Sequence, residues 1–120
     1  MVHASDSLAL AALELLVHLE RGDLPKDFCA ISAELPDDLA IAIVREDELP
    51  RNWRPYPAPV RLRAIGYEWL AAAETAALAV PSAVIPAERN LLLNPTHPDF
   101  GRISFGPGRL LRFDPSLASR

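Results

Sequence analysis

Twelve prolines are spread along the 120 residues of this chain, and their spacing limits where a long helix can form. Proline lacks the amide hydrogen that a helix interior needs, and its ring clashes with the preceding turn. Only residues 1–24 and 60–80 are free of proline over a stretch that suits a long helix. The segments between them must therefore be short strands and turns. This mixture has no regular βαβ rhythm, so it predicts an α+β fold with mostly antiparallel strands.

The first window predicts a helix over about residues 6–21. Ser5, Asp6 and Ser7 provide capping oxygens, a segment rich in Leu and Ala follows, and Gly22 suits the end. On a helical wheel, Leu and Val side chains cover most of the circumference. The remaining strip carries Ala11, Glu14, His18 and Arg21. We therefore expect a helix that is buried on most sides and has one narrow polar stripe.

The second window predicts a helix over about residues 60–76, with a potential irregularity at Gly66. Apolar runs predict strands at 28–33 and 39–44, both largely buried, and shorter strands at 78–80 and 91–93. Residues 47–53 are expected to form a turn or a short helical loop. The Gly-Pro-Gly sequence at 106–108 is a strong turn signal, and it predicts a hairpin between segments 102–105 and 109–113.

Length and composition indicate a single domain that folds around one core. The net charge of −4 argues against direct binding to nucleic acid, which normally needs a basic face. A single cysteine, Cys29, excludes an internal disulfide and suits a reducing cytoplasm. No apolar run reaches the roughly 18 residues that span a bilayer, and the N-terminus lacks a secretory pattern. We expect a soluble cytoplasmic protein that does not enter membranes.

Two interpretations of Glu14 remain open. As a solvated carboxylate four residues before His18, it would contribute only about 0.2–0.5 kcal/mol to the helix. If the polar stripe faces a cleft instead, an isolated carboxylate could stabilise a developing positive charge. The sequence pattern does not decide between these interpretations.

The segment VPSAVIPAERNLLLNPTHPDF (80–100) is unusually rich in proline and in small polar residues. No G-x-S-x-G sequence surrounds Ser82, and His97 and Asp99 are too close in sequence to form a triad with it. Taken singly, Ser82 would satisfy loop backbone groups, Asn90 and Asn94 would form turns, and His97 would anchor a loop.

Other chemistries have little support. The three histidines and Cys29 lack the spacing of a zinc site, so no metal is predicted. No glycine-rich loop that would cradle a phosphate is present. Trp53 and Trp69 are assigned to the core.

Five segments together carry a resemblance that extends over essentially the whole chain. Three are continuous: SDSLALAALELLVHL (5–19), VPSAVIPAERNLLLNPTHPDF (80–100) and FDPSL (113–117). The other two are spaced sets, one of Leu49, Pro50 and Trp53 and one of Ile65, Gly66 and Trp69. With them the chain resembles the RES-domain family. Its members are mostly toxins of bacterial toxin–antitoxin pairs, with an ADP-ribosyltransferase-like α+β fold.

The resemblance implies that NAD⁺ is the substrate and is cleaved between nicotinamide and ribose, with no cofactor. Phosphorolysis, with phosphate as co-substrate, hydrolysis and ADP-ribosyl transfer are all implied possibilities. The family's catalytic glutamate matches Glu14 and its serine matches Ser82. Residues implied to bind NAD⁺ are Ser5, Asn90, Asn94 and His97. A carboxylate suits this reaction because the ribose becomes oxocarbenium-like as nicotinamide leaves.

The chain departs from the family pattern at its N-terminus. The family's arginine-containing segment has no match here, and His3 stands where a tyrosine is usual. We therefore expect residues 1–120 to form one RES-like domain that is shortened at its N-terminus. A truncated chain, a start codon assigned too late and a naturally short variant would each explain this.

Whether the domain is an active enzyme stays open at this point. One hypothesis is an NAD⁺-consuming toxin domain. Another is an inactive remnant that binds an antitoxin or associates with itself, and a distant third is a hydrolase that uses Ser82. The resemblance implies a small DNA-binding antitoxin as partner.

Overall fold

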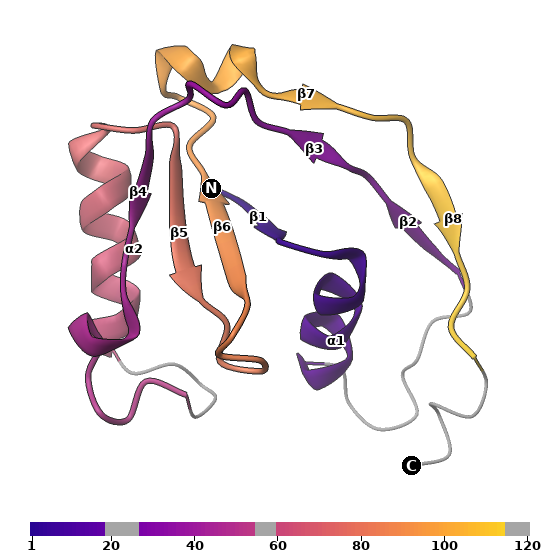
Figure 1. Cartoon of the computed structure of the whole chain (residues 1–120), viewed down its shortest axis with the longest axis horizontal. Coiled ribbons are helices and arrows are strands. Elements are labelled where there is room, and N and C mark those ends of the chain that lie inside the picture. The colour runs from indigo at the N-terminus through magenta and orange to yellow at the C-terminus, as the bar shows by residue number, and fades with distance from the viewer. Residues whose placement is uncertain (19–26, 55–59, 115–120) are drawn as a thin grey trace.

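The structure, a computed structural model, describes residues 1–18, 27–54 and 60–114 (Figure 1). Within these ranges the chain forms two α-helices, two 3-10 helices and eight short strands. In chain order they are β1 (Val2–Ser5), α1 (Leu8–His18), β2 (Phe28–Ala30), β3 (Ala33–Glu34), β4 (Ile41–Ile43), η1 (Glu46–Glu48), α2 (Val60–Ala72), β5 (Ala77–Pro81), β6 (Arg89–Leu93), η2 (Pro98–Arg102), β7 (Ser104–Phe105) and β8 (Arg109–Leu111). The predicted α+β class with mostly antiparallel strands is confirmed.

The centre of the fold is a four-stranded sheet in the order β1-β6-β5-β4 (Figure 1). β6 pairs antiparallel with both β1 and β5, whereas β4 runs parallel to β5. Side chains alternate between the two faces of a strand. One face, here named the core face, carries Ala77 and Leu93, which pack with Leu39 and Ile103 in the hydrophobic core.

The opposite face is here named the pocket face. Strand register places His3, Leu92 and Leu78 in one row across it. Ser5, Asn90 and Val80 form the next row. The helix α2 packs on this face, since a Cβ at Gly66 would lie 3.6 Å from Cδ1 of Leu92.

The remaining strands form a long antiparallel ribbon that arches away from the sheet (Figure 1). β2 pairs with β8 and β3 pairs with β7, so the predicted hairpin across Gly-Pro-Gly is wrong. Gly106 and Gly108 instead allow the two sides of this ribbon to approach each other closely. A Cβ at Gly106 would lie 2.5 Å from Oγ of Ser32, and one at Gly108 would lie 2.5 Å from Sγ of Cys29. The predicted single strand at 28–33 is accordingly divided into β2 and β3.

The helix α1 begins as predicted but is buried less than predicted. Ser7 caps it, because the Leu10 N–H donates to Ser7 Oγ at 3.1 Å. Leu10 is buried, but four other apolar side chains are between 37% and 56% exposed. These are Leu8, Leu13, Leu15 and Val17. The helical wheel identified the apolar positions correctly, but the described residues cover only the side of the helix near Leu10. Its predicted end, near Gly22, lies outside the described residues.

The helix α2 runs without interruption through Gly66, so the expected irregularity is absent. It ends at Ala72 rather than near 76, because Ala73 adopts a left-handed backbone with φ of 52°. The Trp69 Nε1–H donates to Thr75 Oγ1 at 2.9 Å, and Thr75 Oγ1 donates to the Ala77 carbonyl. These bonds tie the helix end to the start of β5, and Trp69 is buried as predicted.

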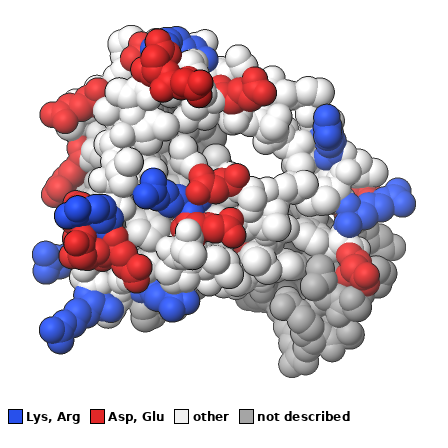
Figure 2. Space-filling view, in the orientation of Figure 1, with Lys and Arg blue, Asp and Glu red and all other residues white. Residues whose placement is uncertain are grey.

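Charged side chains of both signs are interspersed on the face shown in Figure 2. None of the helices in the described part of the chain is long and apolar enough to cross a membrane.

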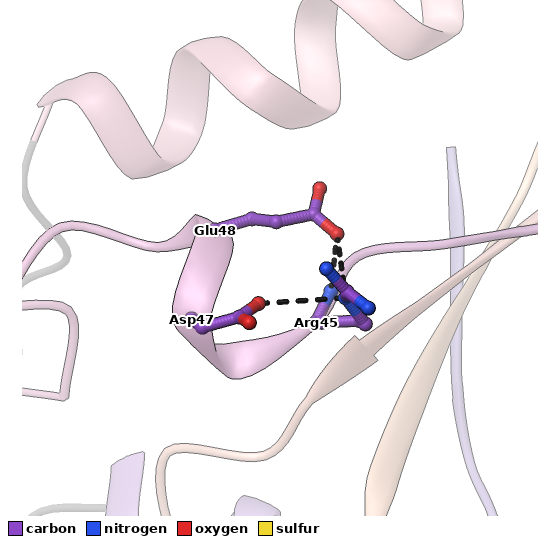
Figure 3. Close-up of polar contacts among 3 residues, drawn as sticks. All are labelled: Arg45, Asp47 and Glu48. Carbon is purple, nitrogen blue, oxygen red and sulfur yellow. Dashed lines mark hydrogen bonds and ion pairs between the residues drawn. The ribbon is translucent and has the colours of Figure 1, made fainter.

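The segment after β4 brings the chain to one end of the pocket face. β4 is an edge strand, so Ile41 and Ile43 are exposed and the predicted burial of 39–44 is wrong for them. A short η1 helix follows, as the predicted turn or helical loop, with Arg45 beside Asp47 and Glu48 (Figure 3). The chain then turns so that Trp53 becomes buried.

Candidate active site

A pocket of about 730 Å³ lies against the pocket face of the sheet. Its walls come from α1, from α2, from the segment 49–54 and from the loop after β5. This volume falls within the roughly 300–1,000 Å³ that is usual for small-molecule sites. Both helices therefore contribute to one cavity, although α1 and α2 lie far apart in the sequence.

Glu14 is the single carboxylate among the described residues that line this pocket. Its Oε1 accepts a hydrogen bond from Ser82 Oγ at 2.6 Å and another from Asn90 Nδ2 at 2.7 Å. Within the described part of the chain, no hydrogen bond to Oε2 is formed. Oε1 is thus fixed by two donors, and none of the described residues occupies Oε2. The polar stripe of α1 faces the pocket through Glu14.

Ser82 is fully buried immediately after β5. Besides donating to Glu14, its Oγ accepts hydrogen bonds from the N–H groups of Val84 and Ile85, each at 3.1 Å. The loop bonds expected from the sequence therefore coexist with the contact to the carboxylate. Because the two N–H groups occupy the oxygen's lone pairs, the hydroxyl hydrogen is directed towards Glu14.

Asn90 is oriented by its cross-strand partner. Ser5 Oγ donates to Asn90 Oδ1 at 2.7 Å, and the two residues are paired in the β1–β6 register. With its carbonyl oxygen held by Ser5, the Asn90 amide nitrogen is directed towards Glu14. The result is a continuous hydrogen-bond network, Ser5–Asn90–Glu14–Ser82, here named the glutamate network.

Asn94 and His97 lie beyond the other end of β6 and do not line the pocket. Asn94 is buried, and its Oδ1 accepts from the N–H and the Oγ1 of Thr96. His97 Nδ1 accepts from the Asp99 N–H at 3.0 Å and so caps η2. Both residues have the turn and loop contacts that their types suggested, and the glutamate network does not include them. Ser82 donates to Glu14, so it forms no triad with His97 and Asp99.

Several pocket residues were not predicted as site residues. Trp53 is buried as expected but also forms part of the pocket wall. Arg54, Arg63 and Tyr67 line the pocket as well. For Trp53 a signal was available, because it belongs to one of the segments that carry the family resemblance. Ile65 and Gly66, from another of those segments, also line the pocket.

No metal centre is evident in the ranges that the structure describes, since no group of three or more His, Cys, Asp or Glu side chains could hold an ion there. The described lining of the pocket offers a positioned carboxylate, neutral hydrogen-bond donors and arginine side chains.

Comparison with known proteins gives the family. The model of the RES domain matches residues 1–114. The chain belongs to the RES domain family. It is 37% identical over 119 residues to the "Prs ADP-ribosylating toxin" of Sphingobium sp. (strain YBL2). This match covers 98% of the chain and 74% of that toxin.

Two further relatives are each named "Toxin Res". The one from Yersinia enterocolitica is 38% identical over 99 residues, and the one from Photorhabdus laumondii is 39% identical over 100 residues. Each match covers 82% of this RES domain, but only 64% and 63% of the relatives, respectively. This RES domain thus spans less than two thirds of the length of these two proteins.

Proposed function

We propose that this RES domain cleaves NAD⁺ at the bond between nicotinamide and ribose. The observation that carries the proposal is the position of Glu14, which lines the pocket with Oε1 fixed by two donors. The ADP-ribosylating relative supports it, because transfer of ADP-ribose from NAD⁺ begins by breaking the same bond.

In the first step the C1′–N bond of the nicotinamide riboside breaks, and its electron pair leaves with the nicotinamide ring nitrogen. The ribose becomes an oxocarbenium-like cation, and the negative charge of Glu14 stabilises it electrostatically. A nucleophile then adds to C1′ and releases its proton to solvent. Phosphate, water or an acceptor side chain would give phosphorolysis, hydrolysis or ADP-ribosyl transfer, respectively, so the three reactions share the role of Glu14.

Ser82, Asn90 and Ser5 are positioning residues in this proposal. Two short hydrogen bonds hold Glu14 Oε1, so the carboxylate does not have to reorganise as positive charge develops. Asn94 and His97 have no part in it, because both lie outside the pocket.

The test is nicotinamide release from NAD⁺, measured with and without inorganic phosphate. Glu14→Gln should lower kcat about 100- to 1,000-fold, because the amide keeps the side-chain shape but removes the charge. The matched control is Glu68→Gln, which changes an exposed carboxylate on α2 that does not line the pocket. Equal nicotinamide release by wild type and Glu14→Gln would overturn the role of Glu14, and no release by either would overturn the proposed activity.

We further propose an antitoxin protein as a partner, since all three of these relatives are named as toxins. A cytoplasmic location is part of the same proposal, because a single free cysteine suits a reducing compartment.

A second candidate function is that of an interaction module without catalytic activity. The exposed apolar side chains of α1 favour it, because apolar surface of this kind often marks a protein interface. Light scattering of the purified chain, alone and with a candidate antitoxin protein, tests this candidate. A module would form a complex or a dimer that Leu13→Lys weakens, whereas a strict monomer with full NAD⁺ cleavage would contradict it.

A further inference from the structure

The pocket differs in charge from the chain that forms it. The whole chain has a net charge of −4, and acidic and basic groups are mixed on the face shown in Figure 2. The described pocket lining, in contrast, has two guanidinium groups, from Arg54 and Arg63, and only the Glu14 carboxylate. That carboxylate is already engaged by Ser82 and Asn90.

Neither arginine has a carboxylate partner among the described residues. The ion pairs of the described chain involve Arg45, Arg102 and Arg112 instead. Two arginines without acidic partners in one small-molecule pocket attract anions, because the guanidinium fork matches phosphoryl oxygens in geometry.

Arg54 is also held in place on the pocket wall. Its Nε–H donates to the Ala83 carbonyl at 3.0 Å, in the loop that follows Ser82. The adjacent Trp53 is 94% buried (6% exposed), so the backbone that carries Arg54 is well anchored. This contact uses the Nε donor, and no described residue bonds to the two terminal nitrogens of the guanidinium group, which we assign to a ligand.

We infer that Arg54 and Arg63 form a phosphoryl-binding subsite of the pocket that Glu14 also lines. The inference rests on the proposed function, since the ligand it names is the diphosphate of the dinucleotide. Inorganic phosphate, as the attacking group, presents the same oxygens. The subsite sets affinity for phosphorylated ligands, whereas Glu14 acts on the nicotinamide–ribose bond.

The first measurement is binding of ADP-ribose, which contains the diphosphate but no bond to cleave. Trp53 lies in the pocket wall and provides an intrinsic fluorescence signal. Arg54→Gln and Arg63→Gln should each raise the Kd for ADP-ribose about tenfold, because each loses charge-assisted hydrogen bonds. Added salt should weaken binding more in wild type than in the double variant.

The chain supplies matched controls. Arg51→Gln and Arg61→Gln change two exposed arginines that do not line the pocket. They lie in the same two segments as Arg54 and Arg63. These variants should bind ADP-ribose within about twofold of wild type, which separates a local subsite from a general effect of charge. Melting temperatures of all four variants should stay close to that of wild type, since all four side chains are exposed.

The second measurement separates the two sources of phosphoryl oxygens. In Arg54→Gln and Arg63→Gln, the KM for NAD⁺ in steady-state cleavage should rise with little change in kcat. Cleavage of nicotinamide riboside, which lacks phosphate, should be unaffected by these substitutions.

The other outcomes are equally informative. If ADP-ribose binding is unchanged in these variants and only the KM for inorganic phosphate rises, the subsite belongs to the free phosphate. If neither quantity responds, or if wild type binds neither ligand, the inference is overturned. If ADP-ribose binding depends on the pair but no nicotinamide is ever released, the proposed cleavage fails and the subsite stands.

Discussion

The two faces of the central sheet are built from adjacent residues but have different roles: one packs in the hydrophobic core and the other lines the pocket. On β6, Leu93 is directed to the core face and is fully buried, whereas Leu92 is directed to the pocket face and remains partly exposed. The same alternation puts Leu91 towards the core and Asn90 in the glutamate network. One strand therefore supports the core through packing and the candidate site through hydrogen bonds.

The difference shows that stability and chemistry can be separated along a single strand. The core face is held by apolar burial, which is non-directional and additive over area. The pocket face depends on a few directed bonds to Glu14, and these bonds matter mainly for where the carboxylate lies. Substitutions on the core face should consequently lower the free energy of unfolding, whereas substitutions in the glutamate network should mainly lower kcat.

The largest effect on stability is expected on the core face. Leu93→Ala should lower the free energy of unfolding by about 2–5 kcal/mol, because it leaves a cavity beneath Ala77 and Leu39. Urea denaturation followed by circular dichroism measures this change. The neighbouring Leu92→Ala serves as the matched control and should cost clearly less, since Leu92 already faces the pocket. Equal losses in the two variants would contradict the division between the faces.

Ser82→Ala should lower both the stability of the fold and the rate of nicotinamide release, because Ser82 joins the loop backbone to the glutamate network. The variant leaves the N–H groups of Val84 and Ile85 without their acceptor and removes one donor from Glu14. We expect a loss of about 1–3 kcal/mol in unfolding free energy, together with a lower kcat for nicotinamide release. Ser82→Thr keeps the hydroxyl and would show whether the effect follows the hydrogen bonds. Full activity in Ser82→Ala would remove Ser82 from the positioning role.

Ser5→Ala should have a smaller effect, since Ser5 reaches Glu14 only through Asn90. Loss of the Ser5–Asn90 bond should cost about 0.5–1.5 kcal/mol, and Asn90 would gain freedom to rotate away from the carboxylate. A double-mutant cycle of Ser5→Ala and Asn90→Ala measures the coupling between them. Strictly additive changes in kcat would show that Ser5 does not act through Asn90.

The main helices and part of the site were predictable because their signals are local. Proline spacing limited the helices to the two windows in which α1 and α2 occur. The pairing of Glu14 with Ser82 followed from the family resemblance, since the residues are distant in sequence and each had an ordinary structural explanation. Their actual contact, at 2.6 Å, comes from tertiary structure.

The errors have a common physical origin in contacts between distant segments. Gly-Pro-Gly suggested a hairpin because turn propensity is a local property, but Gly106 and Gly108 instead allow close approach to Ser32 and Cys29. The helical wheel of α1 showed which residues are apolar, but it contains no information about what covers them. Exposed arginines carry no periodic signal, so Arg54 and Arg63 could be joined to one pocket only in three dimensions.

The smallest effect is expected for Arg45, whose ion pairs lie at the surface beside the segment leading to the pocket. Arg45 contacts Asp47 at 3.4 Å and Glu48 at 3.3 Å (Figure 3), but its side chain is 71% exposed. Solvent screens such pairs, so Arg45→Ala should change unfolding free energy by no more than about 0.5 kcal/mol. ADP-ribose binding should also be unchanged, because Arg54 is positioned by its own bond to Ala83 and by the buried Trp53. A clear loss of binding in Arg45→Ala, measured by the same fluorescence titration, would mean that η1 rather than Trp53 holds this wall of the pocket.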